Sequence, residues 1–295
     1  MIRGCWWLSC ATRSPGSGGL SAVGAPQYHP YVDISLDYVA HLGRESARFA
    51  EAIAAAPPAA PVPPCPDWTA DDLLWHLARV QWWWATIVRD QLAGPEARQL
   101  VPERPPARPG LLEFYQRASQ DLQQALGTAS PDAPAWTWSD DHTVGFIQRK
   151  QAHEALIHRV DAEVTAGNRT PMDSRLSADG VDEVLRVMYT GVPEWGSFAP
   201  DESKVLRVRA TDTGDSWLIT LGRFTGTDPE GTSYDEPDFS IADRDSGAPA
   251  SAFISGAAAD LDCWLWHRPP IGAIDQSGDS DVLSEFTAAI APGID

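Results

Sequence analysis

Residues 68–80, WTADDLLWHLARV, decide the first half of this fold. Thr69 can cap the N-terminus of a helix, and Asp72 follows three residues later, which is close to the capping-box pattern. The apolar residues after the cap recur at helical spacing. We therefore predict a helix that begins at Thr69 and runs to about Leu92.

A histidine interrupts the apolar face of that helix. Each residue of an α-helix advances by about 100°. His76 therefore falls in the middle of an apolar stripe made by Leu73, Val80, Trp83 and Ile87. One interpretation is a core histidine whose ring nitrogens find hydrogen-bond partners. The other is a metal ligand in the core of a helical bundle.

A second stretch, residues 151–161 (QAHEALIHRVD), places further ligand-type residues on another predicted helix. His153 and His158 are five residues apart, roughly 140° around the helix, and cannot easily share one ion. Glu154 and His158 are four residues apart and share a face, and Asp161 extends the same row. The HExxH pattern of zinc proteases needs histidines at i and i+4, so a protease is disfavoured.

His76, Glu154 and His158 can together complete a metal site. Three ligands of mixed nitrogen and oxygen type suit Zn²⁺ or a similar divalent ion, and they leave one coordination position open, as in catalytic sites. Because histidine must be neutral and glutamate ionised to bind, such a site should lose metal in acid. A solvated helix face is the alternative interpretation of Glu154 and His158.

Apolar periodicity and proline-rich connections divide the chain into two parts. The first part should form a bundle of four helices, at 33–56, 69–92, 110–127 and 142–166. The second should mix helices and strands, at 177–191, 205–210, 217–221, 238–243, 250–255, 256–267 and 280–290. We predict an all-α domain over residues 31–170 and a smaller α+β domain over 175–292, with a boundary near 170–176.

The net charge limits the possible binding partners, and the cysteine content indicates the redox compartment. The formal net charge is -19, which disfavours nucleic acid and anionic membrane surfaces because both need a basic footprint. No apolar run approaches the roughly 18 residues of a membrane span. The four cysteines form no CxxC pair and no disulfide-dense pattern, which favours a reducing cytoplasm. Residues 1–30, rich in Gly, Ser and Pro, should form a disordered extension or reflect a start codon assigned too early.

The two motif stretches also resemble a known family. Residues 61–80 (PVPPCPDWTADDLLWHLARV) and 151–167 (QAHEALIHRVDAEVTAG) look like the metal-binding segments of mycothiol-dependent maleylpyruvate isomerases. The resemblance spans about residues 33–290 and is diffuse outside these segments. It implies a DinB-like four-helix bundle, followed by an α+β domain similar to sterol-carrier proteins.

That resemblance also implies a chemistry. His76, Glu154 and His158 would be Zn²⁺ ligands, and mycothiol, a low-molecular-weight thiol, would be the thiol cofactor. The family isomerises maleylpyruvate to fumarylpyruvate: a thiolate adds to the double bond, allows rotation and leaves. Residues 261–270 (LDCWLWHRPP) resemble the segment that supplies a catalytic arginine, so Arg268 would pair with a substrate carboxylate. A surface arginine is the other interpretation of Arg268.

Three classes of function remain open. A metal- and thiol-dependent enzyme, an isomerase or a thiol transferase acting on small electrophiles, should bind a metal with an open position. A non-catalytic binding or regulatory protein would keep the same fold without turnover. A lipid-binding module would need a long apolar cavity in the C-terminal domain. The ligand-type residues favour the first class.

Overall fold

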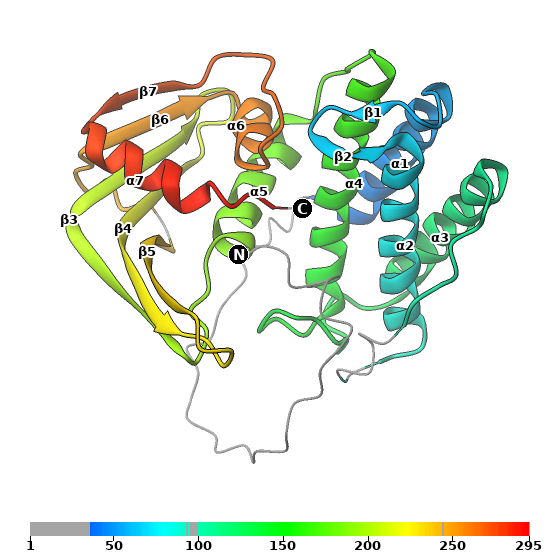
Figure 1. The fold of residues 1–295 in the computed structure, drawn as a ribbon, viewed down its shortest axis with the longest axis horizontal. Coiled ribbons are helices and arrows are strands. Elements are labelled where there is room, and N and C mark those ends of the chain that lie inside the picture. The colour runs from blue at the N-terminus through cyan, green and yellow to red at the C-terminus, as the bar shows by residue number, and fades with distance from the viewer. Residues whose placement is uncertain (1–35, 93, 95–99, 244, 295) are drawn as a thin grey trace. The chain divides into compact units, whose positions relative to one another are not determined.

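The computed structural model describes residues 36–92, 94, 100–243 and 245–294, and the extension expected at residues 1–30 lies outside them. The chain divides into two compact units, the first ending at Thr170 and the second beginning at Pro171. Figure 1 shows a mainly helical first unit and a second unit built on a sheet.

The described part of the first unit is built on four long helices. They are α1 (Tyr38–Ala55), α2 (Ala70–Arg89), α3 (Arg108–Thr128) and α4 (Val144–Ala166). Helix α1 packs on α4 and α2 packs on α3, and further contacts join α1 to α3 and α2 to α4. The helical bundle predicted for this half of the chain is confirmed.

Local signals fix the ends of these helices. The Thr69 hydroxyl accepts from the Asp72 N–H at 3.3 Å, while the Asp72 carboxylate accepts from the Thr69 N–H at 3.0 Å, so the capping box is complete. Helix α4 ends at Gly167, whose φ of 74° is a left-handed conformation that glycine adopts at little cost. Arg108 donates to carbonyls at the end of α1 and pairs with Asp71 in the first turn of α2, which ties these ends together.

The connection between α1 and α2 contains a small sheet. Strands β1 (Pro61–Val62) and β2 (Cys65–Thr69) pair antiparallel. The prolines predicted a non-helical segment but gave no indication of this pairing. The all-α description of this domain is corrected to that extent. Strand β2 leads directly into the cap of α2 and thereby places Trp68 beside that helix.

The second unit begins with α5 (Ser174–Glu183), which continues into one π-helical segment, η2 (Val184–Met188). A five-stranded sheet follows, with strand order β5-β4-β3-β6-β7, in which β3 and β6 are parallel and the other neighbours antiparallel. Its strands are β3 (Gly196–Ala210), β4 (Ser216–Thr227), β5 (Ser233–Ile241), β6 (Ala252–Gly256) and β7 (Asp275–Gly278). The remaining helices are α6 (Ala258–Leu265) and α7 (Ser280–Ile290).

The sheet follows the alternation of its sequence. Leu206, Val208 and Ala210 of β3 are buried, and Leu206 lies opposite the buried Ile219 of β4. Helix α7 lies across the sheet and contacts all five strands (Figure 1). The α+β class predicted for this half is therefore confirmed, and β3 and β4 pair antiparallel as a hairpin.

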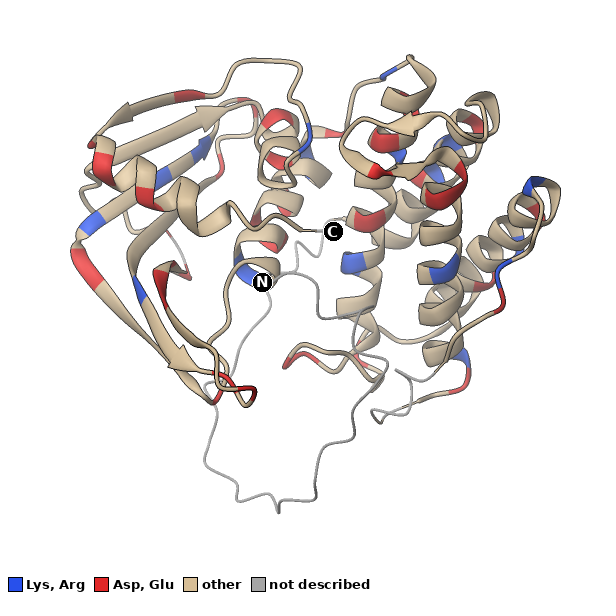
Figure 2. Cartoon of the chain, in the orientation of Figure 1, with Lys and Arg blue, Asp and Glu red and all other residues tan. Residues whose placement is uncertain are grey.

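Acidic residues recur on the helices and strands of both units, as Figure 2 shows, in line with the net charge of -19. Among the residues with a described structure, no helix has the length and apolar character needed to cross a membrane.

Candidate metal centre

Helix α2 carries His76 into the interior of the bundle. The capping box fixes the start of this helix, less than two turns before the histidine. His76 is 7% exposed, and Leu73, Leu77 and Val80 around it are buried. The position predicted for His76, in the middle of a buried stripe, is confirmed.

Helix α4 is buried on nearly every side, so its two ligand-type residues are interior. Glu154 is 7% and His158 is 2% exposed, which contradicts the alternative of a solvated helix face. His153 is also fully buried, but its ring packs edge-on against Tyr38, with centroids 6.3 Å apart. His153 is not part of the group that includes Glu154 and His158. The five-residue spacing between His153 and His158 predicted this separation.

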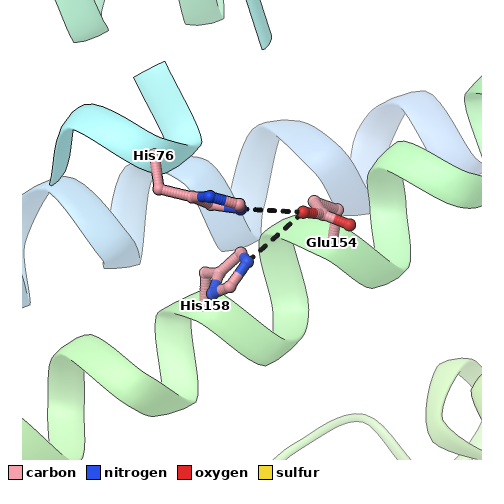
Figure 3. A group of neighbouring side chains, drawn as sticks. All are labelled: His76, Glu154 and His158. Carbon is pink, nitrogen blue, oxygen red and sulfur yellow. Dashed lines mark hydrogen bonds and ion pairs between the residues drawn. The ribbon is translucent and has the colours of Figure 1, made fainter. Parts of the chain in front are cut away.

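The side chains of His76 on α2 and His158 on α4 both point toward the carboxylate of Glu154 on α4 (Figure 3). Its Oε1 lies 3.4 Å from His76 Nε2 and 3.3 Å from His158 Nε2. The donor atoms of all three residues lie within 4.8 Å of one another. Both histidines thus present the same ring nitrogen to one carboxylate oxygen.

These separations fit a divalent ion. Donor atoms at about 2.0–2.1 Å from a tetrahedral ion stand about 3.3 Å apart, which matches both distances from Glu154 Oε1. Two neutral imidazoles and one carboxylate are a donor set that Zn²⁺ and similar ions accept. Across the described ranges, no other cluster of histidine, cysteine and carboxylate side chains comes this close together.

Two further buried side chains orient His158 and Glu154. His158 Nδ1 lies 3.0 Å from Asp161 Oδ2, which sets Nε2 as the nitrogen that faces Glu154. Lys150 Nζ lies 3.2 Å from the second oxygen of Glu154, Oε2. Lys150, Glu154 and His158 succeed one another at intervals of four residues, so they form one row along α4.

The pKa values of the two histidines shift in opposite directions. Burial lowers the pKa of His76 to about 4, so its ring is neutral near pH 7. Burial would also lower the pKa of His158, but hydrogen bonds with Asp161 and Glu154 raise it above its ordinary value. Burial opposes ionisation of Glu154, yet the Lys150 ammonium and the two histidines hold its pKa well below the usual range.

Trp68 packs against the two histidines. Its ring centroid lies 4.7 Å from that of His76 and 6.3 Å from that of His158. Trp68 is half-buried and comes from β2, just before the Thr69 cap. The indole therefore restricts access of water to the imidazoles from its side.

Arg268 belongs to the second unit, just after α6. It is 4% exposed, which contradicts the alternative of a surface arginine. Its Nη1 donates to the carbonyl of Trp266 at 2.7 Å and to that of Ile294 at 3.4 Å. Backbone carbonyls thus hold one end of its guanidinium.

The residue before Arg268 turns the chain at the end of α6. His267 has a φ of 58°, which lies in the left-handed region that glycine adopts most readily. Its Nε2 also lies 2.8 Å from the carbonyl oxygen of Ile290. The Arg268 N–H then donates to the Cys263 carbonyl at 2.7 Å, so this turn fixes the backbone of Arg268.

Sequence reasoning singled out neither Lys150 nor the contact of Trp68 with the histidines. A signal existed for Lys150, because it precedes Glu154 by four residues on the same helix. No signal existed for Trp68, whose position depends on the small β1–β2 sheet.

Fold and site together define a class: a two-unit protein whose helical unit brings together three buried side chains that could hold a metal ion. Residues 39–163 match the family model described as the mycothiol maleylpyruvate isomerase N-terminal domain, and residues 175–285 match the corresponding C-terminal domain. The chain therefore belongs to the mycothiol-dependent maleylpyruvate isomerase family.

One solved structure shows the same fold. The crystal structure of the mycothiol-dependent maleylpyruvate isomerase aligns with 82% of this chain and 93% of its own, at a TM-score of 0.50 and 14% identity. A crystal structure of a mutant of that isomerase covers the same shares, at a TM-score of 0.49 and 13% identity. A search of curated proteins finds no match to this chain.

Proposed function

We propose that the chain is a metal-dependent enzyme that uses mycothiol to act on a small electrophilic substrate. Cis–trans isomerisation of maleylpyruvate is the reaction that its family suggests first. The observation that carries the proposal is the buried donor set of His76, Glu154 and His158. Three protein donors leave a position for an external ligand, which distinguishes catalytic from structural sites.

The residues of the site have separate roles in this proposal. His76 and His158 would offer neutral Nε2 atoms, and Glu154 would offer Oε1, to Zn²⁺ as the favoured ion. The bound ion would stabilise the ionised form of a thiol near neutral pH. Asp161 would keep the Nδ1 proton of His158 in place, and Trp68 would limit the access of water.

Arg268 is the proposed partner of a substrate carboxylate. Support comes from its buried guanidinium, which backbone carbonyls anchor at Nη1. The planar guanidinium group pairs with carboxylates through two parallel hydrogen bonds, which lysine cannot reproduce. Replacing Arg268 with Lys should therefore raise KM for a dicarboxylic substrate more than it lowers binding of the thiol.

Thiol binding and turnover, measured on the same Zn²⁺-loaded protein, test the proposal. We expect calorimetry to detect mycothiol binding, and S-methylated mycothiol, which cannot ionise, to bind at least tenfold more weakly. Conversion of maleylpyruvate to fumarylpyruvate, followed by absorbance, should require both metal and thiol.

Each failure has its own meaning. Binding of mycothiol without turnover of maleylpyruvate or other unsaturated acids would favour the alternative, a non-catalytic binding protein with the same fold. Turnover that survives removal of either the metal or the thiol would contradict the proposed mechanism. Equal binding of mycothiol and its S-methyl form would contradict the role of the ionised sulfur.

A further inference from the structure

Lys150 is a buried lysine directed at a proposed metal ligand. Its side chain is 1% exposed, and its Nζ lies 3.2 Å from Glu154 Oε2. The other oxygen of the same carboxylate, Oε1, faces the two histidine nitrogens. The two oxygens of Glu154 therefore have different partners: a cation on one side and the donor cluster on the other.

Burying an ammonium group costs free energy, so the burial of Lys150 needs a physical explanation. Removing a lysine charge from water costs several kcal/mol unless a counter-charge is close. The chain uses arginine almost throughout, and Lys150 and Lys204 are the only lysines among its 22 basic residues. A compact ammonium can approach one carboxylate oxygen, whereas the fork of an arginine tends to engage both.

We propose that Lys150 is a positioning residue that keeps Glu154 a one-oxygen ligand and so reserves a coordination position for an external anion. This inference rests on the metal site of the proposed function. A carboxylate can bind an ion through one or both oxygens. While Lys150 holds Oε2 in a charge-assisted contact, only Oε1 is available to the ion.

The loss of Lys150 has a defined consequence. In Lys150→Met, a side chain of similar length replaces the ammonium, so Oε2 is released. Glu154 can then bind through both oxygens and occupy the position that an external ligand would use. The fourth ligand should consequently be excluded even though the metal is still bound.

Co²⁺-loaded protein tests this consequence without an activity assay, because the visible absorption of Co²⁺ depends on the ligands that the ion holds. In Lys150→Met the second oxygen of Glu154 replaces the external ligand, so the ion stays four-coordinate and its visible spectrum should shift without a large loss of intensity. We expect Lys150→Met to keep one Co²⁺ per chain and to bind azide, used as a small anionic probe, at least about tenfold more weakly.

Lys204→Met is the matched control, because Lys204 pairs with Glu285 in the second unit. It should match the wild type in spectrum and azide affinity. If Lys150→Met does not fold, Lys150→Gln, which removes the charge and keeps a donor, should show the same changes at smaller size. An unchanged spectrum and azide affinity in the folded variant would overturn the role of Lys150. A wild type that binds no Co²⁺ would instead overturn the metal site itself.

Discussion

The imidazole of His158 and the carboxylate of Asp161 form a buried pair one helical turn apart, with Nδ1 3.0 Å from Oδ2. Asp161 is fully buried, so this contact is shielded from solvent. It orients Nε2 toward Glu154 and makes the ring a stronger donor to a metal.

Replacing that carboxylate should weaken metal binding. Asp161→Asn keeps the size and one acceptor oxygen but removes the charge that favours metal donation by His158. We expect Zn²⁺ affinity to fall about 10- to 100-fold, as measured by competition with a chromophoric chelator. An affinity unchanged within about threefold would contradict the supporting role of Asp161.

Metal binding should release one proton in mildly acidic solution. The raised pKa of His158 keeps its ring protonated at pH 6.5 and below, whereas His76, with a pKa of about 4, is already neutral. Zn²⁺ therefore displaces a proton from His158 alone, and its affinity should fall as the pH falls. Between pH 6.5 and about 5 the slope of log affinity against pH should be about one. A slope approaching two would mean that both histidines titrate normally.

Trp68, which packs against the two histidines, should slow the loss of metal. Trp68→Ala exposes the imidazole of His76, so release of Zn²⁺ to excess chelator should become several-fold faster. Trp75→Ala is the control, because Trp75 is also half-buried and packs on Phe114 instead. Equal acceleration in both variants would attribute the effect to general loosening of the bundle.

A buried ion network should stabilise the helical unit independently of metal. Arg159 is fully buried and bonds Glu45 of α1 and Glu163 of α4, each at 2.8 Å. Arg159→Met leaves two buried carboxylates without this cation, so the free energy of unfolding should fall by about 3–5 kcal/mol in urea titrations. The exposed pair of Arg117 and Glu113 is the control, and Arg117→Met should leave the unfolding midpoint nearly unchanged.

The sequence predicted those parts of the fold that local chemistry determines. The capping box at Thr69 predicted the start of α2, and apolar periodicity predicted the strand around Val208. Strand β3, however, begins at Gly196, because its first half pairs with β4 although its polar, proline-containing sequence shows no alternation. Strand β7 was not predicted, since all four of its residues are exposed.

In the candidate site, too, local sequence patterns predicted one part of the arrangement, and tertiary packing determines the rest. Helical spacing was enough to put Glu154 and His158 on one face and His76 on a buried stripe. The meeting of these residues depends on the packing of α2 against α4, which no local pattern encodes. The network of Arg159 likewise depends on α1, whose Glu45 lies 114 residues earlier in the chain.

Metal content is the most direct test of the central claim that His76, Glu154 and His158 hold a divalent ion. Mass spectrometry of protein purified without a histidine tag should find about one metal per chain in the wild type. His76→Ala, Glu154→Gln and His158→Ala should each lose most of it, while His153→Ala should keep it. A wild type that remains empty when offered Zn²⁺ at neutral pH, or variants that bind it as tightly as the wild type, would contradict the account.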